Sequence, residues 1–326
     1  MKKRIIVQGR LSADQRAELA QHFELLDPLN SFDTNDEHVR TVLGQAHGII
    51  GSGLPISSEL LDAAPNLEVI ALISVGYDTV PVDELTRRGI LLCNTPDVLT
   101  ETTADTGFTL LMATARRVVE LATWVKAGAW EASIGPDLYG SDVNGKTLGM
   151  VGFGRIGQAV ARRGALGFGM KVLYSNASPK PDVERELGAE RRELDALLAE
   201  SDFVCLTVPL TEETEKLIGA DELKQMKSSA ILINIARGKV VDEGALIEAL
   251  ENGTIRGAGL DVFEQEPLAD TSPLPGMANV VALPHIGSAT HETRTAMAQR
   301  AVDNIRLALT GERPISMVNE ESWKTT

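Results

Sequence analysis

Long hydrophobic runs are absent from this sequence of 326 residues. No apolar stretch reaches the roughly 18 residues that a membrane-spanning helix requires. The amino-terminal segment MKKRIIVQGR is basic, but its apolar part, IIV, is too short for the hydrophobic region of a signal peptide. We therefore expect a first strand at this position and no membrane partner for the protein.

Cysteine and histidine are scarce, with two and five residues respectively. Cys93 and Cys205 each lie in an apolar run, which favours buried free thiols in a reducing compartment, and we expect a cytoplasmic protein. The His, Cys and carboxylate residues show no metal-ligand spacing such as H-x-x-x-H or C-x-x-C. The sequence therefore predicts no metal site.

Basic residues are in the minority, because 31 Lys and Arg stand against 46 Asp and Glu, and the formal net charge is −15. This balance argues against nucleic acid as a partner, but it is compatible with an anionic substrate at a locally positive site. Apolar residues, in contrast, make up 43% of the chain. They are sufficient for ordinary cores, and the length suits two domains.

Short apolar runs alternate with helical patterns in the first hundred residues. The expected strands span 4–8, 48–52, 67–73 and 90–94, and the expected helices between them span 13–23 and 57–65. Alternation of this kind predicts a parallel sheet with helices on its faces.

A single long helix is predicted over 102–128, because apolar residues recur there with helical periodicity for about six turns. A second alternating series follows it. Its expected strands span 147–153, 171–175, 203–209, 230–236, 257–263 and 279–284, with helices at 245–253 and 291–311. The fold class is therefore predicted as α/β, with two Rossmann-like sheets in one chain.

A glycine-rich loop joins a strand to a helix in this second series. Gly152, Gly154 and Gly157 have the G-x-G-x-x-G spacing between TLGMV and QAVARR. The first glycine permits a tight turn, the second lets the backbone approach a pyrophosphate, and the third lets the helix pack on the strand. This context predicts dinucleotide binding, and a tight turn without a ligand is the alternative.

Hydride transfer to a bound substrate needs a cation, an acid or base that titrates near neutral pH, and a group that orients it. Three successive predicted strands are each followed by a polar candidate. Arg237 follows the first, the pair Glu264 and Glu266 the second, and His285 the third. A lone histidine after a strand is usually structural, and a lone arginine usually forms a surface ion pair. Three complementary groups at neighbouring strand ends favour a catalytic set, in which His285 of LPHIGS carries the proton and a carboxylate fixes its tautomer.

The segments GFGRIG, NIARGKVVDEGAL, GAGLDVFEQEP and LPHIGSAT resemble the D-isomer-specific 2-hydroxyacid dehydrogenases. The likeness continues in SVGYDTVPVDELTRRGI and NTPDVLTETTADT and extends over essentially the whole chain. Within the family, VKAGAWEASIGPDLYGSDVNGKTLG and SDFVCLTVPLTEETEKLIG are similar to the bacterial glyoxylate/hydroxypyruvate reductases that also reduce 2-ketogluconate.

The resemblance implies a discontinuous architecture. A flavodoxin-like substrate domain would comprise residues 1–101 and 290–326, and a doubly wound dinucleotide-binding domain would comprise 102–289. The helices at 102–128 and 291–311 would join the two domains, with the active site in the cleft between them. The family also implies a homodimer.

The resemblance further implies a role for each motif residue. His285 would donate the proton, and Glu266, directly before Pro267, is favoured over Glu264 as its partner. Arg237 would hold the 2-oxo-carboxylate. The substrate carboxylate would also accept hydrogen bonds from the backbone N–H groups of Val75 and Gly76. The implied cofactor contacts are Thr103, Gly152, Gly154, Arg155, Ile156, Gly157, Ser175, Asn176, Pro209, Ile235, Asp261 and Gly287.

The function implied is NAD(P)H-dependent reduction of small 2-oxo acids, namely glyoxylate, hydroxypyruvate and 2-ketogluconate, to D-2-hydroxy acids. One alternative is a protein of the same fold that senses NAD(H) without turnover. Another is a dehydrogenase of a different subtype, acting on phosphite, formate or phosphoglycerate.

The segment VLYSNASPK bears on the choice of cofactor. NAD enzymes usually carry Asp or Glu at the end of this strand, where the carboxylate binds the ribose hydroxyls and repels a 2′-phosphate. This chain has Asn176, and the nearest cation in the segment is Lys180. The sequence therefore predicts use of both cofactors with NADP modestly favoured; the alternative is that Asn176 binds the ribose of NADH.

Overall fold

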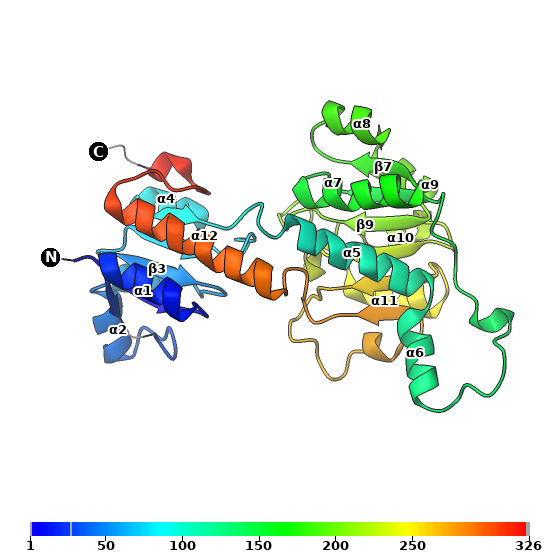
Figure 1. Ribbon diagram of the computed structural model, residues 1–326, viewed down its shortest axis with the longest axis horizontal. Coiled ribbons are helices and arrows are strands. Elements are labelled where there is room, and N and C mark those ends of the chain that lie inside the picture. The colour runs from blue at the N-terminus through cyan, green and yellow to red at the C-terminus, as the bar shows by residue number, and fades with distance from the viewer. Residues whose placement is uncertain (1, 27, 324–326) are drawn as a thin grey trace. The chain divides into compact units, whose positions relative to one another are not determined.

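The computed structural model describes residues 2–26 and 28–323. The chain divides into two compact units, Met1–Leu99 with Thr290–Thr326, and Thr100–Ala289 (Figure 1). We call the first the discontinuous unit and the second the central unit. Each has its own parallel sheet.

The discontinuous unit contains a five-stranded sheet in the order β2-β1-β3-β4-β5, in which every neighbouring pair is parallel. This order is that of a flavodoxin-like doubly wound sheet. The strands are β1 (Arg4–Gln8), β2 (Glu24–Leu26), β3 (Gly48–Gly51), β4 (Val69–Leu72) and β5 (Leu91–Cys93).

Helices cover both faces of this sheet. They are α1 (Ala13–His22), α2 (Glu37–Leu43), α3 (Ser58–Ala63), α4 (Val82–Arg88) and α12 (His291–Thr310). The register partners Ile6, Ile49, Ile70 and Leu92 form one buried row that packs with side chains of α2, α3 and α4. On the other face α12 lies so close to β3 that a Cβ on Gly48 would be 2.9 Å from the Cδ1 of Ile305. The carboxyl-terminal helix is therefore an integral part of this unit.

The central unit contains a seven-stranded parallel sheet in the order β12-β11-β10-β9-β6-β7-β8. The chain begins in the middle at β6, winds outward to β8 and then returns to β9. Ligands of such sheets bind at this reversal, outside the carboxyl ends of the strands. The strands are β6 (Thr147–Val151), β7 (Lys171–Ser175), β8 (Glu190–Arg191), β9 (Phe203–Leu206), β10 (Ile231–Asn234), β11 (Gly257–Leu260) and β12 (Val280–Ala282).

Two apolar rows explain why both faces of the central sheet are covered. Tyr174, Met150, Cys205 and Ile233 are register partners that pack against α5 and α7. Leu173, Val204, Leu232 and Ala258 point to the other face and pack against α9, α10 and α11. The helices are α5 (Thr100–Ala115), α6 (Val118–Lys126), α7 (Arg155–Arg162), α8 (Pro181–Leu187), α9 (Leu194–Glu200), α10 (Ala220–Gln225) and α11 (Glu243–Glu251).

The described residues also include five short helical turns. Four are of the 3-10 type, Pro136–Leu138, Gly238–Val240, Leu274–Gly276 and Glu320–Ser322, and a π-helical turn over Arg163–Gly167 extends α7. With its two doubly wound sheets, the structure confirms the predicted α/β fold class.

The prediction of one continuous helix over 102–128 is wrong. The helix ends at Ala115, and α6 begins at Val118 after Arg117, whose φ of 54° is left-handed. The Arg117 guanidinium forms an ion pair with Glu120 and donates a hydrogen bond to the carbonyl of Asp137. These contacts hold the break, which the regular apolar spacing does not reveal.

Two strands, β2 and β8, are missing from the predicted set. They have three and two residues and exposed or half-buried side chains, so they lack an apolar run. Each pairs with one strand at the edge of its sheet. Such edges are difficult to predict because pairing, rather than side-chain pattern, defines them.

Cys93 and Cys205 are buried free thiols, and burial raises the pKa of each to about 12. Both are therefore protonated, unreactive thiols near neutral pH. Within residues 2–26 and 28–323, no helix is long and apolar enough to cross a bilayer.

Candidate active site

His285 and Glu266 come together because they follow neighbouring parallel strands. Leu260, the last residue of β11, is the register partner of Ala282, the last residue of β12. The turns after both strands therefore leave the sheet side by side at its carboxyl edge. Glu266 lies in the first of these turns and His285 in the second.

The two side chains form a hydrogen bond of 2.7 Å between His285 Nδ1 and Glu266 Oε2. The other carboxylate oxygen, Oε1, accepts the backbone N–H of Phe263 at 3.0 Å, which fixes the direction of the Glu266 side chain. Because Nδ1 is engaged, Nε2 is the ring atom that is oriented to exchange a proton with a ligand. The His285 side chain is 49% exposed, so a substrate can reach it.

The turn that carries His285 is held by a buried carboxylate. His285 has a left-handed φ of 53°, and Asp261, which is 2% exposed, accepts the N–H groups of the next two residues. The distances are 2.7 Å from Ile286 to Oδ1 and 2.8 Å from Gly287 to Oδ2. Burial raises the pKa of Asp261, and these two hydrogen bonds oppose the rise. Asp261 thus stabilises an unusual backbone conformation at the proposed proton donor.

Asp261, Gly287 and Thr103, all three expected to contact a cofactor, meet at this place. A Cβ on Gly287 would be 3.1 Å from Asp261 Oδ2 and 3.3 Å from Thr103 Cγ2. Gly287 is therefore required for the close approach of the His285 turn to α5. The structure brings together three positions that are far apart in the sequence.

Arg237 follows β10, which pairs with β11. Its turn is shaped by Asn234, a buried residue whose Oδ1 accepts the N–H of Ala236 and whose Nδ2 donates to the carbonyl of Arg237, both at 3.0 Å. The half-buried guanidinium donates through Nη1 to the carbonyl of Ala236 at 2.8 Å. The backbone therefore fixes where the Arg237 side chain leaves the sheet.

Gly238 joins the Arg237 turn to the Glu266 turn. A Cβ at this position would be only 1.8 Å from the carbonyl carbon of Phe263, so any other residue would push the two turns apart. The roles of Asn234 and Gly238 in shaping these turns were not predicted from the sequence. Both lie in the quoted segment NIARG, where an amide at the end of a buried strand and a glycine after arginine were available signals.

Glu264 does not face His285. Its Oε1 accepts the N–H of Glu243 at 3.2 Å, and its own N–H donates to Glu243 Oε2 at 3.0 Å. This reciprocal pair ties the turn after β11 to the start of α11. Glu266 is thus the carboxylate that reaches the histidine, and Glu264 provides a natural control for it.

His285 and Glu266 together are called the dyad below. A pocket of about 540 Å³ lies beside this dyad within the central unit. Glu266 and His285 line it together with apolar side chains that include Phe263, Leu268 and Leu283. Mostly apolar walls with a few polar side chains are typical of ligand-binding pockets.

The glycine loop has the geometry expected for a dinucleotide cradle. Gly152 has a φ of 89°, and a Cβ there would be 2.8 Å from the backbone N of Val208. A Cβ on Gly157 would be 2.6 Å from the carbonyl oxygen of Gly152, so this glycine lets α7 pack on the strand. At Gly154, the N-cap of α7, a Cβ would meet nothing within 4 Å. The loop is therefore tight on the protein side and open on the ligand side.

The loop after β7 is tied to this cradle. Asn176 accepts the backbone N–H of Phe153 through Oδ1 at 2.9 Å, and the N–H of Gly152 donates to the carbonyl of Ser175, also at 2.9 Å. The Asn176 amide nitrogen donates to the carbonyl of Ser178 at 2.9 Å. The Oδ1 atom of Asn176 would be the acceptor for a ribose hydroxyl, and it already accepts a hydrogen bond from the backbone of the cradle.

The remaining predicted positions lie as follows. Arg155 and Ile156 open α7, Pro209 follows β9 and Ile235 follows β10, all at the carboxyl edge of the central sheet. Val75 and Gly76 lie in the discontinuous unit, in the loop after β4. Their backbone N–H groups donate to no other described residue, as an anion site requires.

These residues fit a nicotinamide dinucleotide. The open side of Gly154 and the amino end of α7 suit a pyrophosphate, which favours the amino end of a helix. Thr103, Asp261 and Gly287 lie next to the proposed proton donor and would hold the nicotinamide end. Across the described ranges, no group of three or more His, Cys, Asp or Glu residues is arranged to bind a metal ion.

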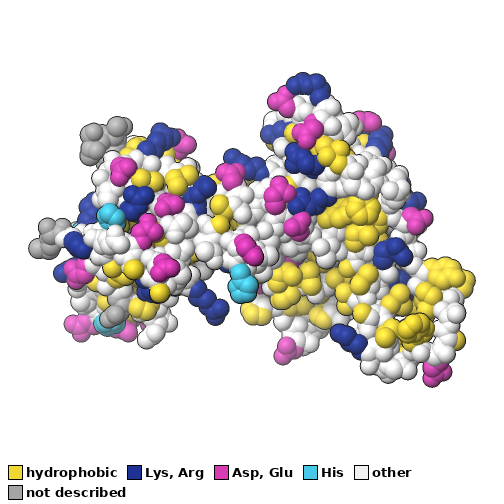
Figure 2. Space-filling model, viewed as in Figure 1, with side chains coloured by type: hydrophobic (Ala, Val, Ile, Leu, Met, Phe, Trp, Pro, Cys, Tyr) yellow, Lys and Arg dark blue, Asp and Glu magenta, His cyan; other side chains and the backbone are white. Residues whose placement is uncertain are grey.

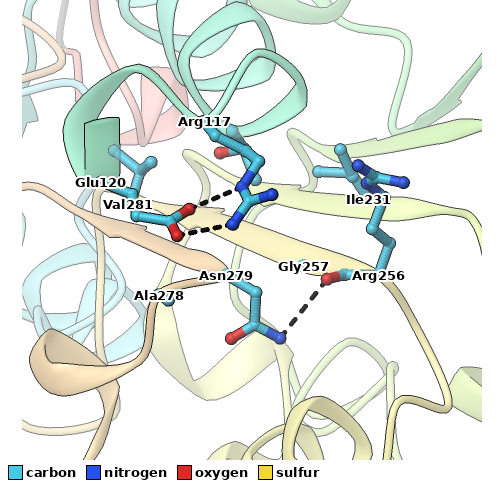
Figure 3. Close-up of a pocket in the computed structure, with 9 residues that line it drawn as sticks. Arg117, Glu120, Ile231, Arg256, Gly257, Ala278, Asn279 and Val281 are labelled. Carbon is cyan, nitrogen blue, oxygen red and sulfur yellow. Dashed lines mark hydrogen bonds and ion pairs between the residues drawn. The ribbon is translucent and has the colours of Figure 1, made fainter. Parts of the chain in front are cut away.

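A second pocket, of about 180 Å³, lies at the opposite edge of the same sheet (Figure 3). Ile231 and Gly257, which begin β10 and β11, line it. Arg117 binds Glu120 there through two hydrogen bonds of 2.7 and 2.6 Å, and Asn279 donates to the carbonyl of Arg256 at 3.4 Å. Because dinucleotides bind at the carboxyl edge, this pocket is separate from the candidate active site.

Comparisons with known proteins show what this chain is similar to. Residues 108–287 match the family described as D-isomer specific 2-hydroxyacid dehydrogenase, NAD binding domain. The chain is 54% identical to glyoxylate/hydroxypyruvate reductase B of Serratia proteamaculans, over 99% of this chain and 100% of that protein.

Solved structures are similar over nearly the whole chain as well. One is the NADPH-dependent glyoxylate/hydroxypyruvate reductase of Sinorhizobium meliloti in complex with NADP and malonate, with a TM-score of 0.89, 36% identity, and coverage of 100% of this chain and 99% of that chain. Another is D-lactate dehydrogenase of Aquifex aeolicus complexed with NAD and lactic acid, with a TM-score of 0.87, 29% identity, and coverage of 97% and 99%.

The first prediction concerns His285. Substitution His285→Gln should retain dinucleotide affinity and lower kcat about 10²- to 10⁴-fold, because general acid catalysis contributes that much to rate. Steady-state kinetics with a 2-oxo acid and a binding titration of the cofactor would measure both quantities. Near-normal turnover in this variant would show that His285 has a structural role only.

The second prediction separates Glu266 from Glu264. Glu266→Gln should lower kcat about tenfold or more, since it replaces a hydrogen bond between ionisable groups by a neutral one. Glu264→Gln makes the same change in the same turn, but it affects only the contact with Glu243. Equal losses of kcat in the two variants would contradict the assignment of Glu266 to the dyad.

Proposed function

The chain belongs to the D-isomer specific 2-hydroxyacid dehydrogenase family, and from that premise we propose that it reduces small 2-oxo acids to D-2-hydroxy acids with NAD(P)H. Glyoxylate and hydroxypyruvate are the proposed main substrates, with 2-ketogluconate as a larger one. The observation that carries the proposal is the 2.7 Å hydrogen bond between His285 and Glu266, in the sheet that holds the glycine cradle. The names of the Serratia and Sinorhizobium relatives support the substrate class.

In this proposal a bound nicotinamide dinucleotide supplies the hydride to the carbonyl carbon. His285 donates a proton through Nε2 to the carbonyl oxygen, so that the two additions yield a hydroxyl group. Glu266 holds Nδ1 and thereby keeps Nε2 directed away from itself and available to the substrate. Arg237 binds the oxo-carboxylate through parallel guanidinium donors, and the N–H groups of Val75 and Gly76 are further proposed carboxylate donors.

A protein that senses NAD(H) without turnover is the alternative. It would need the cradle but not the dyad. The orientation of His285 by Glu266 and the bracing of its turn by Asp261 both support an enzyme. We therefore favour catalysis.

We propose distinct roles for the two parts of the chain. Residues 102–289 form the dinucleotide-binding domain, and residues 1–101 with 290–326 form the substrate domain. The position of Gly152, Gly154 and Gly157 supports the first assignment, and so does the family match over 108–287.

We further propose that the protein is a cytoplasmic homodimer. Exposed apolar side chains gather over the central unit, among them Val118, Val125, Trp130, Tyr139 and Leu166 (Figure 2). Two of these side chains, Val118 and Leu166, line an open groove of about 750 Å³ whose wall also contains Phe108, Met112 and Phe168. Exposed apolar surface of this kind is typical of subunit interfaces. The buried free thiols support a reducing compartment.

The proposed cofactor preference is for NADPH, with NADH as the weaker substrate. The loop after β7 has no carboxylate at Asn176 to repel a 2′-phosphate. The Sinorhizobium relative, which is described as NADPH-dependent, supports this choice.

The third prediction tests the function itself. The purified protein should oxidise NADPH in the presence of glyoxylate, hydroxypyruvate or 2-ketogluconate, followed as loss of nicotinamide absorbance, and should convert hydroxypyruvate to D-glycerate. Pyruvate should be a poorer substrate than hydroxypyruvate, which differs from it only by a hydroxyl group available for polar contacts. Absence of oxidation with every acid would favour the sensing alternative, and strict preference for pyruvate would contradict the substrate class.

The fourth prediction concerns Asn176. Substitution Asn176→Asp should move the preference from NADPH to NADH, because the new carboxylate repels a 2′-phosphate and still accepts the N–H of Phe153. The measurement is the ratio of kcat/KM for the two cofactors in both proteins. A ratio in the unaltered protein that favours NADH about tenfold, or no change on substitution, would refute the proposed preference.

A further inference from the structure

Arg191 lies at the end of β7 although it is fifteen residues away from Asn176 in the sequence. It is the second of the two residues of β8, and it is the register partner of Tyr174 on β7. Its guanidinium donates through Nη2 to the carbonyl oxygen of Asn176, the residue directly after β7, at 3.1 Å. Parallel pairing with a neighbouring strand thus brings an arginine to the segment VLYSNASPK, whose one cation is Lys180.

The Arg191 guanidinium is available to a ligand. Its side chain is exposed, and this single hydrogen bond is its only contact with a carbonyl or carboxylate among the described residues. A guanidinium has five N–H donors, so most of them remain for a ligand. The adjacent Arg192 differs, because it forms ion pairs with Glu190 and Glu200.

The loop beside Arg191 is held in place by a buried tyrosine. Tyr174 is fully buried and stacks on Phe153 of the glycine cradle, with ring centroids 4.2 Å apart. Its hydroxyl donates to Glu184 and accepts the N–H of Lys180 at 2.9 Å. Asn176 fixes the other end of the loop through Phe153 and Ser178. The residues around Arg191 therefore form a preorganised surface next to the cradle.

We propose that Arg191 is the residue that recognises the 2′-phosphate of NADP(H) in this protein. The inference rests on the proposed use of a nicotinamide dinucleotide and names the group that selects between its two forms. At the end of this strand an adenosine ribose meets the protein, and a 2′-phosphate would add negative charge there. The planar guanidinium binds phosphate through paired donors, while Asn176 adds no opposing charge.

The test uses ligands that differ only in this phosphate. Binding of 2′,5′-ADP and of 5′-AMP to the intact protein is measured by calorimetry, together with binding of NADP⁺ and NAD⁺. Arg191→Ala should raise the Kd of 2′,5′-ADP and of NADP⁺ about tenfold or more, the usual effect of losing a hydrogen bond to a charged group. The Kd of 5′-AMP and of NAD⁺ should stay within about twofold.

Arg185→Ala is the matched control. Arg185 lies on α8 and forms an exposed ion pair with Asp182, so its loss removes the same charge without touching the end of β7. Solvent and salt screen such an exposed charge, so this variant should bind all four ligands normally. Arg191→Lys should bind 2′,5′-ADP with intermediate affinity, since lysine keeps the charge but not the paired donors.

Three outcomes would overturn the inference. In the first, Arg191→Ala weakens 5′-AMP as much as 2′,5′-ADP, which would mean that Arg191 only supports the loop. In the second, Arg191→Ala binds both nucleotides normally. In the third, Arg185→Ala matches the loss in Arg191→Ala, which would mean a general effect of charge. Failure of the unaltered protein to bind either dinucleotide would instead overturn the proposed function, and this inference with it.

Discussion

Parallel pairing of β10, β11 and β12 is the constraint on which the candidate site depends. It places three turns at one edge of the central sheet, and these turns carry Arg237, Glu266 and His285. Each turn is then fixed by a local backbone interaction: Asn234 shapes the first, Gly238 allows the first to contact the second, and Asp261 holds the third. The proposed catalytic side chains can therefore be placed accurately although all three lie outside regular secondary structure.

Much of the fold could be predicted from the sequence because buried parallel strands appear as apolar runs. The expected strands at 4–8 and 171–175 coincide with β1 and β7, and the others differ from the structure only at their ends. The predicted helix over 102–128 failed because a left-handed residue, Arg117, interrupts an otherwise regular apolar pattern. The edge strands β2 and β8 failed because they are too short to show any pattern.

The candidate site was predictable to a similar degree. Strand-end motifs indicated His285 and the pair Glu264 and Glu266, and the family resemblance favoured Glu266. The structure shows the hydrogen bond between His285 and Glu266. The supporting residues Asn234 and Gly238 were missed because their role is to shape a turn, which requires knowledge of the neighbouring turn. Arg191 was missed for a related reason: it reaches the end of β7 only through the pairing of β8, a strand that the sequence does not reveal.

The central claim is that the dyad of His285 and Glu266 delivers the proton to a bound 2-oxo acid. A crystal structure of the protein with NADP⁺ and oxalate, an unreactive analogue of glyoxylate, would test it most directly. Our account predicts an oxalate oxygen within hydrogen-bonding distance of His285 Nε2 while Nδ1 remains bound to Glu266. Oxalate bound away from His285, or a histidine that has turned Nε2 towards Glu266, would contradict the account.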